Sequence, residues 1–367
     1  MKHILSIITV LTVFFTASCV KNDYVKEANY DFKTNYEVFW NLVNENYCFL
    51  GDNYGYRKNV YDENGVAQKL DWNKVYEEMM PQVEAATTEE ELMDIMGKSI
   101  DYLQDGHVWL DSKFTHRGCF TFYNIAYPNP EKYPTNFISG LITGQSPKIL
   151  DYVYRSRNGH RYGMITRGNK KFFYLHHADF TKELNKEDLE MFKPLIDKAD
   201  GFIYDIRTNP GGSAQLSFEI AGRFVKEKIL VGYQVLKSGK GYNDLTEPSP
   251  LYVVPSKDGY NWADMKTAVL TNRDVYSTAN MFASYMKEVP NATVIGGITG
   301  GGGGDPTSYY LPNGWTITMS ARKMSLDVNK VHIEAGVEPD ILVDITAEDI
   351  ANKYDRILET AIEYLAK

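Results

Sequence analysis

The sequence has few cysteines, no basic runs and none of the short motifs that bind nucleotides or zinc. Its 367 residues include 3 cysteines, too few for a disulfide framework. The formal net charge of -9, with no long Lys/Arg run, argues against nucleic acid as a main partner, because phosphate neutralisation needs clustered cations. Strings of the type G-x-x-x-x-G-K-S/T, G-x-G-x-x-G and H-E-x-x-H are absent. The sequence therefore implies neither a nucleotide nor a metal or other cofactor.

An apolar run from Ile4 to Phe15 opens the sequence and is too short to span a bilayer as a permanent helix. Small residues separate it from Cys19, so residues 1–19 are predicted to be an export signal that ends at a lipidated cysteine. An ordinary cleaved secretory signal is the alternative. Lipidation predicts an exported protein of the bacterial cell envelope, attached to a membrane through Cys19. The polar residues 20–29 are then a tether.

Two further cysteines, Cys48 and Cys119, remain if Cys19 carries a lipid. An exported compartment permits a disulfide between them. Two buried thiols are the other interpretation, and the sequence leaves the choice open.

Residues 30–112 are predicted to form an N-terminal helical domain. A first helix covers 36–47, a second begins at Asp71 and runs to Val83, and a third begins in the acid-rich stretch 87–91 and runs to about Leu103. The apolar side chains that recur at helical spacing in the first are Val38, Phe39, Leu42, Val43 and Tyr47.

Short aromatic or β-branched runs between Gly, Pro and Asn predict a β-rich insert over residues 113–165. Strands and helices then alternate over 166–367, which indicates an α/β core. The predicted strands are 172–176, 201–205, 268–270 and 315–319, and the predicted helices are 186–199, 213–225, 278–287 and 347–366. The run 300–304 consists of glycine and is predicted to be a flexible loop.

Four short sequence motifs, referred to below as strings, contain the candidate catalytic residues. They are LQDGHV at 103–108, FIYDIRTNPGG at 202–212, VLTNRDVYSTAN at 269–280 and EAGVEPD at 334–340. In this order the set resembles the tail-specific, or C-terminal processing, serine peptidase family, whose relatives include the tricorn core and interphotoreceptor retinoid-binding protein. The resemblance implies an α/β catalytic core of crotonase-like or Clp-protease-like β-β-α units, a peptide or protein substrate and no cofactor. About 55 residues lie between Asp111 and Arg167, too few for the complete PDZ domain that such proteases often carry.

Ser277 begins a predicted helix, where the positive end of the helix dipole favours the negative charge of an acyl-transfer transition state. A serine there can instead simply cap the helix. The surrounding strings favour the role of nucleophile for Ser277.

Gly211 and Gly212 form a turn in which an N–H can approach a substrate oxygen. With the N–H of Thr278 they are the predicted oxyanion hole.

A serine nucleophile needs a base, and the family resemblance implies either a Lys in a glycine-rich segment or a His supported by a Glu. The glycine run after Ser277 holds no Lys. His107 and Glu334 match the second, tricorn-like solution, as general base and orienting acid. His176 and His177 are predicted to be structural, as strand histidines usually are.

A surface lipoprotein that binds peptide or glycan without hydrolysis is the alternative function.

Overall fold

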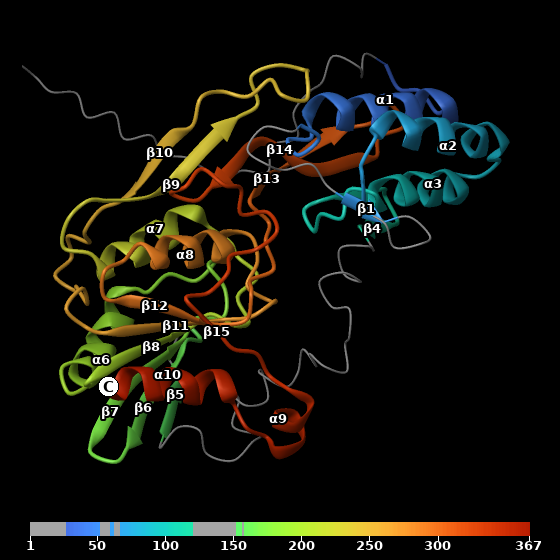
Figure 1. Ribbon diagram of the computed structural model, residues 1–367. Coiled ribbons are helices and arrows are strands. Elements are labelled where there is room, and N and C mark those ends of the chain that lie inside the picture. The colour runs from blue at the N-terminus through green and yellow to red at the C-terminus, as the bar shows by residue number, and fades with distance from the viewer. Residues whose placement is uncertain (1–26, 52–58, 62–66, 120–151, 156–157) are drawn as a thin grey trace, which may run out of the picture.

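The described part of the chain folds around two large β-sheets, one mostly parallel and one antiparallel (Figure 1). The computed structural model describes residues 27–51, 59–61, 67–119, 152–155 and 158–367. The predicted export signal, Cys19 and most of the predicted β-rich insert lie outside these ranges.

Three N-terminal helices form as predicted, each with a capping side chain at its start. They are α1 (Phe32–Asn46), α2 (Trp72–Ala85) and α3 (Glu89–Asp101). Asp71 caps α2, and Thr88 forms a capping box with Glu91 at α3, so side chains satisfy N–H groups that lack partners within each helix. The predicted apolar face of α1 is buried. A two-stranded sheet of β1 (Asn59–Tyr61) and β2 (Ala67–Lys69) interrupts the predicted all-helical region.

These helices pack on an antiparallel sheet whose strands come from both halves of the chain. The sheet order is β10-β9-β14-β3-β4, and β13 pairs with β14. The strands are β3 (Trp109–Asp111), β4 (His116–Gly118), β9 (Ile229–Leu236), β10 (Ser249–Val253), β13 (Gly304–Tyr310) and β14 (Thr316–Leu326). Side chains of β14, including Ile317 and Met319, share one core with α1 to α3. Strands from the C-terminal half of the chain therefore complete the core of the N-terminal helical domain.

The second sheet has the order β15-β12-β11-β8-β7-β6-β5. From β15 to β7 neighbouring strands are parallel, while β6 and β5 are antiparallel additions. The strands are β5 (Tyr152–Arg155), β6 (Arg161–Arg167), β7 (Lys170–His176), β8 (Gly201–Asp205), β11 (Thr267–Thr271), β12 (Ala292–Gly296) and β15 (Ile341–Leu342). The predicted boundary after residue 165 falls inside β6, so the core sheet begins in what was expected to be the insert.

Helices cover both faces of this sheet (Figure 1). One face carries α6 (Lys186–Ile196), α7 (Ala214–Ala221), a 3-10 turn at Gly222–Phe224 and α8 (Thr278–Lys287); the other carries α10 (Arg356–Ala366). The prediction of one closing helix is wrong: α9 (Ala347–Asn352) ends at left-handed Lys353, and Asp355 caps α10 separately. No helix in the described part of the chain is long and apolar enough to cross a membrane.

Three neighbouring parallel strands, β8, β11 and β12, end at one edge of the sheet. The segments that leave them carry the predicted oxyanion turn, Ser277 and the glycine run. Ligands of open parallel sheets bind at this carboxyl edge, so the topology brings distant strings together.

Candidate active site

Ser277 occupies a strained position between the loop after β11 and α8. Its φ of 56° and ψ of -126° are rare for a residue with a side chain. A backbone hydrogen bond from its N–H to the carbonyl of Gly301, 2.9 Å long, helps to hold this conformation. Ser277 Oγ makes no capping bond to α8 and instead lies 3.0 Å from Nε2 of His107. The side chain therefore faces a base, and the capping interpretation is wrong.

His107 stands on a buried turn that Asp105 organises. Asp105 is fully buried, and its Oδ1 accepts the backbone N–H of His107 at 2.8 Å. Its Oδ2 accepts the hydroxyl of Tyr47 at 2.9 Å. Asp105 stands in the DGH string, but the sequence analysis assigned it no role. In the structure it holds the backbone of the turn that carries His107.

Tyr276 connects this turn to the nucleophile. Its hydroxyl donates to Oδ1 of Asp105 at 3.4 Å, and its ring lies 4.9 Å from the ring of His107, centroid to centroid. Burial, and then the nearby charge of Asp105, raises the pKa of Tyr276 well above its usual value, so the phenol stays protonated and able to donate. A residue adjacent to Ser277 thus contacts both the base and Asp105, which holds the turn of the base. Sequence reasoning missed this contact because the partners are 171 residues apart.

The Gly211–Gly212 turn lies directly against Ser277, as predicted, but its two N–H groups differ. The N–H of Gly211 donates to Oδ1 of Asn209 at 2.9 Å. A Cβ built on Gly211 would lie 2.8 Å from Cβ of Ser277, and the φ of +111° also favours glycine. Gly211 therefore allows the turn to lie close to Ser277, but its N–H is already bonded and is not a donor to the substrate. This corrects its predicted part in the oxyanion hole.

Gly212 presents its polar groups toward the nucleophile. The carbonyl of Gly211 and the N–H of Ser213 both bond to Phe180, so the intervening residue points its N–H and carbonyl to the opposite edge. There the carbonyl of Gly212 accepts the hydroxyl of Thr278 at 2.8 Å. This bond joins the two segments whose N–H groups can meet at one substrate oxygen. The first N–H groups of a helix have no partner within it, which leaves that of Thr278 to a ligand.

The glycine run after β12 is buried, so its prediction as a flexible loop is wrong. A Cβ on Gly301 would lie 1.9 Å from the carbonyl oxygen of Glu334, and one on Gly302 would lie 2.6 Å from the ring of Tyr276. Glycine is needed there because the backbone passes between these two groups. Within the described residues no lysine is hydrogen bonded to Ser277.

Glu334 is buried beside this run, and its Oε2 accepts the N–H of Gly303 at 2.7 Å. The loop that carries it is tied to α8, since Nδ2 of Asn280 donates to the carbonyl of Ile333 at 2.9 Å. Asn280 in turn accepts the hydroxyl of Thr299 at 2.5 Å. The orienting role of Glu334 toward His107 stays a prediction, and the sequence leaves open whether the link is direct or through water. Asn280 and Thr299 are two positioning residues that sequence reasoning missed.

Two other features of this region of the chain, the Arg207 ion pairs and the paired histidines His176 and His177, serve the fold. The guanidinium of buried Arg207 binds the carboxylates of Asp205 and Asp355 at 2.7 Å each, joining β8 to the start of α10. Burial alone would raise the pKa of Asp205, but Arg207 brings it below its usual value. His176 and His177 are also buried, and burial lowers their pKa values to about 4 and about 3.

Cys48 and Cys119 are buried thiols and do not form a disulfide. Sγ of Cys48 lies 3.9 Å from the carbonyl of Lys323, and Sγ of Cys119 lies 3.4 Å from that of Ile100. Burial raises the pKa of Cys48 well above its usual value.

Comparison with known proteins agrees with this geometry. The family models that match are the tricorn protease C1 domain, over residues 28–100, and peptidase family S41, over residues 171–343. The crystal structure of a "putative peptidase" from Parabacteroides merdae ATCC 43184 is 35% identical, with a TM-score of 0.78 and coverage of 92% of this chain and 98% of that one. The chain belongs to peptidase family S41. The predicted family resemblance and the α/β core preceded by helices are thereby confirmed.

Curated relatives match more distantly. A carboxyl-terminal-processing protease of Synechocystis sp. (strain ATCC 27184 / PCC 6803 / Kazusa) is 26% identical over 204 residues, which cover 54% of this chain and 45% of the relative. A tricorn protease homolog of Saccharolobus solfataricus is 26% identical over 230 residues, covering 60% of this chain and 18% of the relative. The chain thus spans less than half the length of either S41 relative.

Proposed function

We propose that this S41 chain hydrolyses peptide bonds, with Ser277 as nucleophile and His107 as general base. The single observation that carries the proposal is the 3.0 Å separation of Ser277 Oγ and His107 Nε2 across 170 residues of sequence. A hydroxyl needs such a neighbour to lose its proton at neutral pH.

In the proposed reaction, neutral His107 accepts the proton of Ser277 as Oγ attacks the carbonyl carbon of the substrate. The imidazolium then gives this proton to the leaving amine, and an acyl-enzyme on Ser277 remains. Water completes the cycle: His107 takes its proton, the resulting hydroxide attacks the acyl carbon, and the proton returns to Oγ of Ser277.

The N–H groups of Gly212 and Thr278 stabilise the oxygen that becomes negative in each step. Support comes from the bond between the hydroxyl of Thr278 and the carbonyl of Gly212, which holds the two donors in fixed relation. Donors fixed in advance stabilise developing charge without reorganising during the reaction.

Glu334 orients the imidazole in this proposal. Its burial and its hydrogen bond from Gly303 keep a carboxylate on the glycine run that also receives Ser277. A carboxylate that orients the base assists without exchanging protons itself. Replacing Glu334 by Gln should therefore cost less activity than removing His107.

The test is hydrolysis of internally quenched peptides and of an unfolded protein such as casein. Ser277→Ala and His107→Ala should lower kcat/KM to the same level, within about tenfold of each other, because such groups act as a unit. His116→Ala is the matched control, since this histidine is exposed and pairs with Asp111. Folded protein that binds these peptides but never cleaves them would instead support the non-hydrolytic binding protein.

We also propose that the peptidase is exported and anchored by a lipid on Cys19, because a short apolar run and small residues precede this cysteine. Intact-mass analysis of protein extracted from membranes should find a diacylglyceryl-modified N-terminal Cys19. A soluble mature chain that begins at another residue contradicts the anchor and leaves the peptidase proposal untouched.

A further inference from the structure

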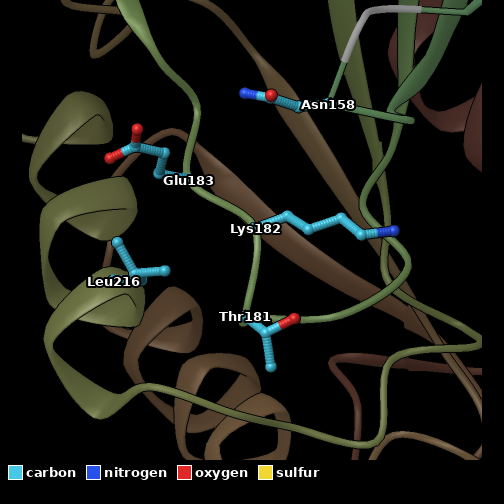
Figure 2. Close-up of a pocket in the computed structure, with 5 residues that line it drawn as sticks. All are labelled: Asn158, Thr181, Lys182, Glu183 and Leu216. Carbon is cyan, nitrogen blue, oxygen red and sulfur yellow. The ribbon is translucent and has the colours of Figure 1, made fainter.

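A pocket of about 340 Å³ lies beside the oxyanion turn, outside the catalytic residues (Figure 2). It is lined by Asn158, Thr181, Lys182, Glu183 and Leu216. Three of these residues belong to the segment after β7, while Leu216 belongs to α7. None of them takes part in the chemistry proposed above.

Both walls of the pocket are attached to the turn that holds the substrate carbonyl. Phe180, the residue before Thr181, donates its N–H to Gly211 and accepts that of Ser213. A Cβ on Gly212 would lie 2.9 Å from the N of Thr181. On the other wall, Leu216 donates its N–H to the hydroxyl of Ser213, which caps α7.

The N–H of Gly212 points to the edge of the turn opposite Phe180, so a peptide with its carbonyl there lies about two strand spacings of 4.8 Å from the wall that carries Thr181. Each residue of an extended peptide advances the chain by about 3.3 Å, and neighbouring side chains point to opposite faces. A long side chain near the scissile bond can span that distance and enter the pocket.

The charges in the pocket favour a cation. Glu183 is exposed and forms no ion pair within the described residues, whereas Nζ of Lys182 lies 3.5 Å from Oδ2 of Asp179. Figure 2 shows the Lys182 amine pointing away from Glu183, and Leu216 on the same side as the carboxylate. Nδ2 of Asn158 is bonded to Asp188 at 2.9 Å, so its amide oxygen is the group left to accept.

We propose that this pocket receives a lysine or arginine side chain that flanks the scissile bond, with Glu183 binding the charged head and Leu216 contacting the aliphatic stem. Lysine and arginine combine an apolar stem with a charged tip, which matches these two walls. The inference rests on the proposed peptidase function, for which it names the substrate class.

The experiment compares quenched peptides that carry Lys, Gln or Glu at each position near the cleaved bond. Glu183→Gln should lower kcat/KM for the Lys peptide by about twofold to fivefold and leave the Gln peptide unchanged, the range expected of one exposed ion pair. Glu183→Lys should transfer the preference to the Glu peptide. Lys182→Gln is the matched control and should retain the Lys preference.

A binding measurement separates failure of the pocket from failure of the peptidase. Anisotropy of labelled peptides on Ser277→Ala protein should show tighter binding of the Lys peptide than of the Gln peptide, and this difference should vanish in the Ser277→Ala, Glu183→Gln double variant. Cleavage without a preference for lysine or arginine overturns the pocket assignment alone. A binding preference without any cleavage by the native chain overturns the peptidase alone.

Discussion

Ser277 and His107 come from two regions of the chain that are held in place by different kinds of contact. Backbone contacts hold the nucleophile. The N–H of Ser277 bonds to the carbonyl of Gly301, and a Cβ built on Gly211 would lie 2.8 Å from Cβ of Ser277. Side chains hold the base, through Asp105 and Tyr276. A backbone contact of this closeness admits no added atom, whereas side-chain contacts can be removed one at a time. We expect abrupt losses on the nucleophile side and graded losses on the base side.

The largest effect is expected from Gly211→Val. Its side chain would displace Ser277 and disrupt the oxyanion site, which typically removes about 10²–10³ in rate. Gly212→Val should do the same by displacing Phe180, where a Cβ would lie 2.6 Å from the carbonyl carbon. The matched control is Gly259→Val, since Gly259 has a φ of +83° but no atom within 4 Å of its Cβ position. Full activity of folded Gly211→Val protein would make the turn purely structural.

Acid should remove activity before it unfolds the protein. Because His107 must be neutral to accept a proton, kcat/KM should fall as acid protonates its imidazole. Circular dichroism in the same buffers should remain native.

Stability should change at lower pH, for a separate reason. Burial lowers the pKa of His176 to about 4 and that of His177 to about 3, so the unfolded chain binds more protons. Their stabilising contribution is complete above about pH 6.5 and is lost as pH falls toward these folded values. Coincident loss of activity and circular dichroism would show that acid acts on the fold and not on the base.

Thr278→Val should lower kcat by about fivefold with little change in KM. It removes the hydroxyl that joins the two oxyanion segments and nearly preserves the shape of the side chain, and a net hydrogen bond contributes about 1 kcal/mol. Thr278→Ser keeps the hydroxyl and should keep most of the activity. Equal activities of the two variants would show that this bond does not position the donors.

The smallest effect is expected on the base side, from Tyr276→Phe. The ring that contacts His107 is kept, and one 3.4 Å hydrogen bond to Asp105 is lost. A twofold to threefold fall in kcat, with an unchanged melting temperature, is expected for a bond of about 0.5 kcal/mol. A loss as large as that of Gly211→Val would remove the contrast between the two regions.

Local sequence patterns predicted the elements around Ser277 well, because each of these patterns lies within a single strand or helix. The strand at 201–205 and the helix at 278–287 are found with the predicted bounds, since a buried apolar run and a helical period identify them directly. The pairing of Asp105 with Tyr276 and the packing of β14 under the N-terminal helices depend on segments far apart in sequence. No local pattern contains them. Glycine composition likewise indicated freedom at 300–304, where the packed structure requires close approach.

The central claim is that His107 activates Ser277, and covalent labelling tests it most directly. A fluorophosphonate probe should modify the purified native chain at Ser277, as located by peptide mass spectrometry, with labelling much slower in His107→Ala and only partly slowed in Glu334→Gln. The His116→Ala control should label at the native rate. Labelling at another serine, or equally fast labelling of Ser277 without His107, would contradict the account.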